Sequence, residues 1–203
     1  MVTHGGFQKT YYLDLVVNQM IYELKVVASL MNDHDAQALH YAMLQDVRLV
    51  KLINFGEKKV RGKLLSNALC SAERYRPTLR KSGLLLCTSQ CERLVAHLKD
   101  LLHDWGTHLS CHLYNEALAY HFGGEDRCEQ RMELRAGPLV LGTHRVQIYA
   151  DAHAFVVTSL SHDQDAYRQH LDILLTHTKL QCIQWINLNR SRVEITTLSM
   201  AGE

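Results

Sequence analysis

The first third of the chain alternates apolar and polar residues with the period of short β-strands, interrupted by one stretch of helical spacing. Asn32 or Asp33 could cap the start of that helix, and Gly56 provides a turn between the last two strands. The predicted elements are strands near 8–17 and 20–27, a helix near 33–46, and strands near 48–54 and 59–65.

The last part of the chain shows a similar order of elements, preceded by a long helical stretch. Leucines line one face of that stretch, which we expect to break at Gly106. The predicted elements are helical residues 90–122, strands near 129–135, 138–141, 144–150 and 153–158, a helix near 163–177, and strands near 181–188 and 192–198.

Short matches between the two parts indicate a degenerate internal repeat. Residues 50–55 (VKLINF) resemble residues 183–188 (IQWINL), so that Asn54 and Asn187 are 133 positions apart (187 − 54). Two further pairs keep that spacing, Val60 with Val193 and Leu65 with Leu198. Upstream, Tyr12-Leu13-Asp14 resembles Tyr149-Ala150-Asp151 at a spacing of 137 (151 − 14), which we interpret as a four-residue deletion.

The repeat and the order of helices and strands predict an α/β protein of two related modules. The 203 residues are 47% hydrophobic and 21% charged, which is typical of a globular protein. We see no secretory signal and no apolar run long enough for a membrane span, and expect reduced cysteines and a cytoplasmic protein. The expected segments are a first module at 1–66, a basic linker at 67–89 and a second module at 90–203.

Cations are concentrated between residues 58 and 81, although the formal net charge of the whole chain is only +1. Glu73 is the one acidic residue in that interval. The cluster could be a surface that faces phosphates, or a solvated connector between the modules. Its members are Lys58, Lys59, Arg61, Lys63, Arg74, Arg76, Arg80 and Lys81.

Three charged residues in the first two long strands are the candidate catalytic group. Asp14 lies on one strand, and Glu23 and Lys25 lie two positions apart on the next, so these two project from the same face. Two carboxylates from neighbouring strands can hold Mg²⁺, and a lysine beside them can orient a water or neutralise developing negative charge. The alternative is a structural Glu–Lys pair on the solvated face of an edge strand.

These residues, with Gln37, Tyr41 and the sequence Leu52-Ile53-Asn54-Phe55-Gly56, resemble the GxxExxY proteins of the PD-(D/E)XK nuclease superfamily. The resemblance covers most of residues 10–66. It implies a restriction-endonuclease-like fold with a mixed sheet flanked by helices, Mg²⁺ or Mn²⁺ dependence and hydrolysis of nucleic acid. By the match, Asp14 and Glu23 would be metal ligands and Lys25 the catalytic lysine. Gln37 would be the helix glutamine near the site.

The sequence also departs from that family. Members of that family begin with a helix that carries the namesake Gly, Glu and Tyr, and the sequence before Asp14 has no room for it. Residues 106–118 resemble that helix instead, and Tyr114 is the one namesake residue that they keep. The second module has Thr158-Ser159-Leu160 near the acid-x-lysine position and retains Asp151. A lone aspartate holds Mg²⁺ poorly, so we expect the second module to be catalytically inactive.

The leading hypothesis is a Mg²⁺-dependent nuclease acting on nucleic acid, with DNA the expected substrate and a phosphate-binding surface at Lys58, Lys59, Arg61 and Lys63. The first module could be completed by the second module or by a homodimer partner. The alternative is an inactive binding or assembly protein built from decayed nuclease modules. A zinc site at His108 and His112 is a third possibility.

Overall fold

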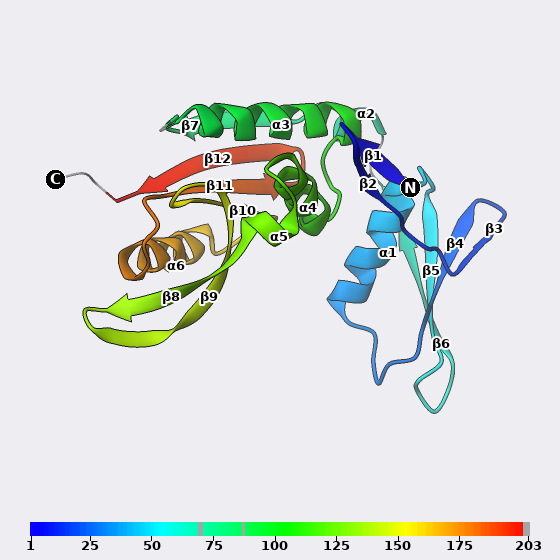
Figure 1. The fold of residues 1–203 in the computed structure, drawn as a ribbon. Coiled ribbons are helices and arrows are strands. Elements are labelled where there is room, and N and C mark those ends of the chain that lie inside the picture. Colours follow the sequence, from blue (N-terminus) through cyan, green and yellow to red (C-terminus); the bar gives the residue numbers. More distant parts are fainter. Residues whose placement is uncertain (69–70, 87, 201–203) are drawn as a thin grey trace. The chain divides into compact units, whose positions relative to one another are not determined.

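The computed structural model describes residues 1–68, 71–86 and 88–200, and it divides the chain into two compact units. The first unit is Met1–Tyr75 with His108–Ser110, and the second is Arg76–Thr107 with Cys111–Glu203. Helices flank mixed sheets in both, which confirms the predicted α/β class (Figure 1). None of the helices within the described residues is long and apolar enough to cross a membrane.

The first unit holds a short antiparallel hairpin and a four-stranded sheet of order β3-β4-β5-β6. β4 and β5 run parallel and are connected by helix α1, whereas the two outer pairs are antiparallel. The elements are β1 (Val2–His4), β2 (Phe7–Lys9), β3 (Leu15–Val17), β4 (Met20–Lys25), α1 (Asn32–Leu44), β5 (Leu49–Asn54), β6 (Arg61–Ser66) and α2 (Ser71–Arg74).

Helix α1 covers one face of this sheet. Ala38 and Ala42 lie one turn apart and are fully buried, so the helix backbone can approach the sheet closely. They pack with the inward residues of β4 and β5, among them Ile21, Val50 and Leu52. The opposite face is less covered, since Leu24 is 40% exposed and Leu64 is 59% exposed.

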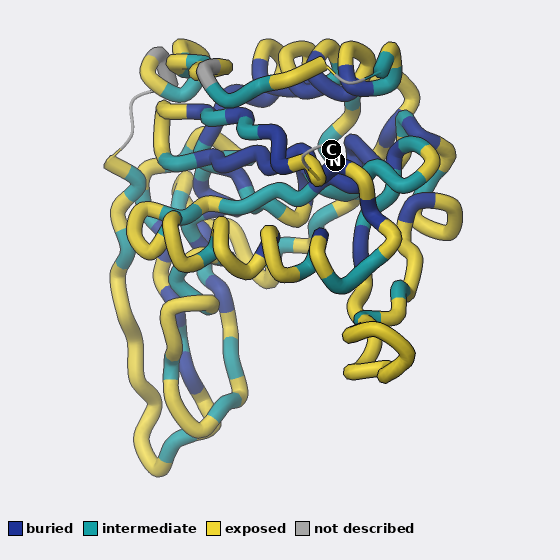
Figure 2. The backbone as a smooth tube through the Cα atoms, turned by 90° about the vertical axis from the view of Figure 1, so that its left-hand side faces the viewer, coloured by how far each residue is buried: buried dark blue, intermediate teal, exposed yellow. Residues whose placement is uncertain are grey.

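The second unit has a six-stranded sheet of order β7-β12-β11-β10-β9-β8. Helix α6 lies on one face of it and α3 on the other (Figure 1). β11 is central and almost wholly buried, as the tube coloured by burial shows (Figure 2). The elements are β7 (Thr78–Gly83), α3 (Ser89–Trp105), α4 (Cys111–His121), α5 (Glu125–Cys128), β8 (Glu129–Ala136), β9 (Leu139–Ala150), β10 (His153–Thr158), α6 (Gln164–His177), β11 (Cys182–Asn189) and β12 (Arg192–Ser199).

Several local predictions hold and others need correction. The helical stretch breaks at Gly106, whose φ of +72° favours glycine, and α4 begins only at Cys111. The strands expected at 138–141 and 144–150 form the single strand β9. Neither Asn32 nor Asp33 caps α1, because the cap position is Met31 and its N–H donates to His34 Nδ1 at 2.9 Å.

The expected basic linker at 67–89 contains a strand of the second sheet. Residues Thr78–Gly83 form β7, which pairs in parallel with β12 and so extends the sheet by one edge strand. The partner positions Thr78 and Arg192 are 114 residues apart (192 − 78). The local pattern of apolar and polar residues could not predict this strand, because Thr78–Gly83 is a strand only through its pairing with the distant β12.

The two sheets share one connectivity. The order β3-β4-α1-β5-β6 in the first unit corresponds to β9-β10-α6-β11-β12 in the second, with the same antiparallel, parallel, antiparallel pairing. The register agrees as well, because Lys25 faces Asn54 and Thr158 faces Asn187, each 133 residues further on (158 − 25, 187 − 54).

Equivalent asparagines hold equivalent loops in the two units. The Asn54 side chain accepts from Val27 N at 3.1 Å and donates to Val27 O at 2.8 Å. The Asn187 side chain accepts from Leu160 N at 2.8 Å and donates to Leu160 O at 3.0 Å. Val27 and Leu160 are also 133 residues apart (160 − 27), so each amide satisfies the backbone just beyond the strand it faces.

His40 is a buried titratable group of the first unit, only 6% exposed. Its Nδ1 accepts from Ser110 N at 3.2 Å, while Nε2 is buried without a hydrogen-bond partner. Burial lowers the pKa of His40 to about 4, with smaller contributions from Arg74 and Lys9. The imidazole is therefore neutral at pH 7.

The free energy of unfolding should fall as pH is lowered from about 6.5 to about 4, because the unfolded chain then binds a proton that the folded His40 does not. The fall due to this residue is at most about 1.4 kcal/mol per pH unit. Urea unfolding across this range should show a shallower fall for His40→Gln than for the wild type. Parallel curves would contradict the assignment.

Candidate active site

A chain of hydrogen bonds links the helix face of β4 to α1. The Lys25 ammonium donates to Glu23 Oε1 at 2.8 Å and to Gln37 Oε1 at 2.8 Å. Gln37 Nε2 donates in turn to the Tyr41 hydroxyl at 2.9 Å. The lysine is thus held in one position by a charge and by an amide that is itself held. The sequence placed Glu23, Lys25 and Gln37 near one another, and the structure brings them together.

The Glu23 carboxylate is unusual because it is buried and only half satisfied. Its side chain is 4% exposed and that of Lys25 is 17% exposed. Oε1 is bonded to Lys25, but Oε2 is buried without a hydrogen-bond partner. Leaving a carboxylate oxygen in this state costs free energy unless a further positive group binds it. A divalent cation has the required charge and prefers oxygen ligands, so the residues present fit a metal here.

Asp14 approaches the same strand from the side. β3 pairs with β4 only from Leu15 onwards, and the exposed Asp14 lies immediately before that ladder. Its Oδ2 accepts from Leu24 N at 2.8 Å, so the side chain takes the place of a ladder carbonyl where the two strands separate. The carboxylate is thereby fixed beside the residue that stands between Glu23 and Lys25.

The cations of β6 lie on the face that carries Glu23 and Lys25. Arg61 faces Asn54, which faces Lys25, and Lys63 is in the corresponding row opposite Leu52 and Glu23. Two strand spacings, about 10 Å, separate these β6 cations from Glu23 and Lys25 on β4. Arg61 also pairs with Glu57 at 2.7 Å, and Lys63 pairs with Asp35.

The rest of the predicted cation cluster does not lie with these residues. Lys58 and Lys59 are exposed in the connection between β5 and β6. Arg74 donates to Met43 O at 2.5 Å at the end of the first unit, and Arg76 begins the second unit. The stretch 58–81 is therefore divided between the units, and Arg61 and Lys63 are its members on the sheet face of the candidate site.

Histidine and cysteine sites receive no support from the described residues. His108 has a positive φ and precedes helix α4, so it does not form a helical i, i+4 pair with His112. His112 instead pairs with Glu116 at 2.8 Å. Within residues 1–68, 71–86 and 88–200 no three His, Cys, Asp or Glu side chains cluster as a metal site. Cys70 and Cys87 lie outside the described residues.

Two contacts at the site were not predicted from the sequence. The ion pair of Lys63 with Asp35 joins positions 28 apart and leaves no local signal. The hydrogen bonds of Asn54 to the backbone of Val27 were not predicted either, since the sequence showed only that this asparagine recurs at Asn187. By contrast, the spacing of Gln37 and Tyr41 at i, i+4 places them on one helix face, as predicted.

The register of the second unit corrects the expected match of Asp151 to Asp14. Leu15 faces Tyr22, and Gln147 faces Phe155, the residue 133 positions after Tyr22. Asp14 thus corresponds to Val146, whereas Asp151 lies in the turn between β9 and β10. The match of identical residues was misleading because it takes no account of how the strands pair. The same register places Val156 at the Glu23 position and Thr158 at the Lys25 position.

The candidate site thus combines an acid immediately before β3, an acid and a lysine on β4, and a glutamine on helix α1. Residues 3–64 match a family model described as the PD-(D/E)XK nuclease superfamily. That segment contains β3 to β5, the first four residues of β6 and all the residues of the candidate site. No curated protein and no solved structure matches the chain.

The Glu23–Lys25 pair should be coupled in stability. Lys25→Met leaves the buried carboxylate of Glu23 without its cation, which should lower the free energy of unfolding by about 3 kcal/mol. Adding Glu23→Leu removes the uncompensated charge, so the double variant should recover most of that loss. Urea unfolding of the four proteins measures this coupling, and strictly additive losses would contradict it.

Proposed function

We propose that this protein is a metal-dependent nuclease that hydrolyses phosphodiester bonds, with the candidate site of the first unit as its catalytic centre. The observation that carries the proposal is the arrangement on β4, where Lys25 is fixed between Glu23 and Gln37 while Glu23 Oε2 stays buried without a partner. A purely structural ion pair with Lys25 would not require Glu23 Oε2 to be buried without a hydrogen-bond partner. The match of residues 3–64 to a nuclease superfamily supports the same conclusion.

Each residue then has a separate role. Asp14 and Glu23 would hold Mg²⁺ or Mn²⁺, which would supply charge neutralisation at the phosphate and a more acidic water. The Lys25 ammonium would orient that water and offset negative charge at the scissile phosphate. Gln37 positions Lys25. Lys58, Lys59, Arg61 and Lys63 would contact neighbouring phosphates of a nucleic acid, for which we expect DNA.

We further propose that the chain is an internal duplication related to the GxxExxY proteins. The common spacing of 133 residues in strand register and in the two asparagine clasps supports the duplication. The proposed modules remain 1–66 and 90–203, with β7 of the intervening segment added to the second sheet. Valines at the two acid positions support the loss of catalysis in the second module.

The alternative function is an inactive binding or assembly protein. One observation favours it, namely that no three His, Cys, Asp or Glu side chains cluster within the described residues and one Asp14 oxygen is already bonded to Leu24 N. Substrate oxygens, waters or a homodimer partner would have to complete the coordination of a metal. Measurement of activity separates the two functions.

Plasmid and oligonucleotide cleavage should require Mg²⁺ or Mn²⁺ and stop in EDTA. Asp14→Asn, Glu23→Gln and Lys25→Met should each lower the rate at least about 100-fold, because each removes a ligand or the activating charge. Asp151→Asn is the matched control, since it removes an equally acidic side chain from a turn of the second unit. Its rate should equal that of the wild type.

Equal rates in the wild type and the three site variants would remove the nuclease proposal for these residues. Calorimetric titration with Mn²⁺ provides a second measurement that does not depend on substrate choice. Heat that disappears in Glu23→Gln but persists in Asp151→Asn supports a metal at this site, and equal heat in both contradicts it.

Nucleic-acid affinity should depend on the exposed lysines of the β5–β6 connection. Lys58→Gln with Lys59→Gln should lower the slope of log affinity against log salt by about 1.8, because two fewer counterions are released from duplex DNA. Fluorescence anisotropy in a Glu23→Gln background avoids cleavage. The paired control Lys99→Gln with Lys179→Gln changes the net charge equally, and an identical slope change there would contradict a local interface.

A further inference from the structure

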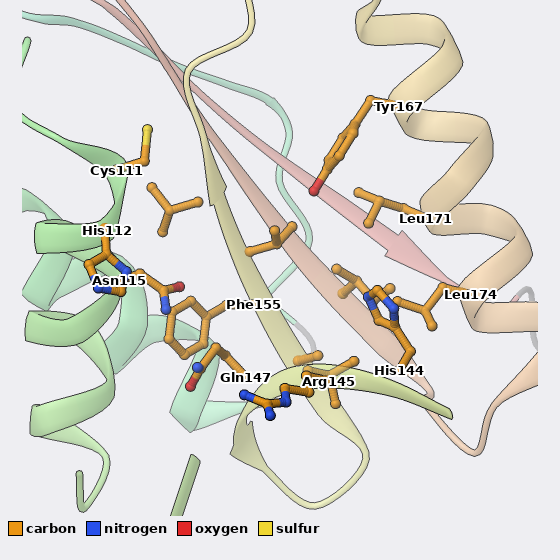
Figure 3. Close-up of a pocket in the computed structure, with 15 residues that line it drawn as sticks. Cys111, His112, Asn115, His144, Arg145, Gln147, Phe155, Tyr167, Leu171 and Leu174 are labelled. Atoms are coloured by element: carbon orange, nitrogen blue, oxygen red, sulfur yellow. The ribbon is translucent and has the colours of Figure 1, made fainter. Parts of the chain in front are cut away.

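The second unit contains a cavity of about 360 Å³ where strand β9 separates from β10. The two strands pair at His153, Ala154 and Phe155 but not beyond, and β9 continues as an arm with β8. Figure 3 shows helix α4 contributing Cys111, His112 and Asn115 on one side and helix α6 contributing Tyr167, Leu171 and Leu174 on the other. The cavity is therefore lined from both faces of the sheet.

This cavity occupies the position of the candidate active site in the first unit. Val146 and Val156, which line it, correspond by register to Asp14 and Glu23. Leu171 and Leu174 on α6 correspond to Ala38 and Tyr41 on α1 by the same 133-residue spacing. The fork between strands is kept while the charged groups are replaced by apolar ones, so the space no longer suits a cation.

The polar groups of the lining suit a ligand that has an anionic group and a ring with N–H donors. His144 and Arg145 lie on β9 and His112 lies on α4, whereas the lining contains no aspartate or glutamate. Arg145 and His112 each also contact a glutamate outside the lining, Glu129 at 3.1 Å and Glu116 at 2.8 Å. Arg145, Glu129 and His112 are exposed, where water weakens such contacts, whereas Glu116 is half-buried.

Two amides and the apolar walls define the rest of the ligand. Gln147 lines the cavity and its Oε1 is buried without a hydrogen-bond partner, so a rotation of this side chain would present an acceptor to a ligand N–H group. Asn115 provides a second amide, and Phe155 and Tyr167 provide aromatic surface. The volume lies within the range of about 300–1,000 Å³ that is usual for small-molecule sites.

We propose that this cavity binds a nucleoside monophosphate, with the base between the apolar walls and its exocyclic amine on Gln147 Oε1. The phosphate lies against Arg145, at the end of the cavity where β9 continues as an arm. Binding here needs neither a metal nor the catalytic residues of the first unit. The site would make the second unit a nucleotide-binding module rather than an inactive remnant.

Calorimetry tests this with full-length Glu23→Gln protein in EDTA, so that the candidate active site cannot contribute. AMP, GMP, CMP and UMP are titrated separately, with inorganic phosphate and adenosine as partial ligands. At least one nucleotide should bind with a dissociation constant on the order of 10–100 μM, and each partial ligand at least about tenfold more weakly.

Two variants locate the site. Arg145→Gln should weaken binding about tenfold or more, whereas Arg131→Gln should not, although Arg131 is its cross-strand partner and equally exposed to solvent. Gln147→Leu should also weaken binding while leaving the melting temperature unchanged or higher, because it removes an unsatisfied buried oxygen. A merely structural glutamine would instead lower the melting temperature.

Three results would overturn the proposal. The first is no saturable binding of any of the four nucleotides up to millimolar concentration. The second is binding that Arg145→Gln and Gln147→Leu leave unchanged, which would locate the ligand elsewhere. The third is inorganic phosphate binding as tightly as the nucleotides, which would reduce the cavity to an anion site. None of these results bears on the nuclease proposal, whose residues are disabled in the protein used.

Discussion

Two opposite charges at consecutive inward positions of β4 are the constraint around which the first unit is built. Glu23 and Lys25 face the helix in a layer otherwise formed by Ile21 and the apolar residues of β5. Burial of such a pair is tolerated only if each member keeps partners. The glutamine of α1 meets this requirement for the ammonium, so helix, strand and charge pair have to be aligned together.

The second unit shows the same framework without that constraint. Its asparagine clasp and strand register repeat those of the first unit, yet valine and threonine replace the charged positions on β10. The inward face becomes a continuous apolar core with Leu171, Leu175 and Trp185. A sheet of this connectivity thus tolerates either a polar centre or an apolar one, provided that the loop after the strand stays anchored.

The sequence predicted those parts whose cause is local. Alternation of period two places Glu23 and Lys25 on one face. The family resemblance predicted that Gln37 lies near them. The parts it could not predict depend on pairing between distant positions. The Asp14 carboxylate replaces a ladder hydrogen bond because β3 separates from β4 at that position. Asp151 is a turn residue because of the register in which β9 and β10 pair.

The parallel pairing of β7 with β12 also affects how the protein can be made. β7 is the first strand of its sheet along the chain and β12 is the last, with 114 residues between Thr78 and its partner Arg192. At ribosomal rates of about 5–20 residues per second, roughly 6–23 s pass before β12 emerges. Throughout that interval β7 has no strand to join, so the second unit completes its sheet only after β12 has been synthesised.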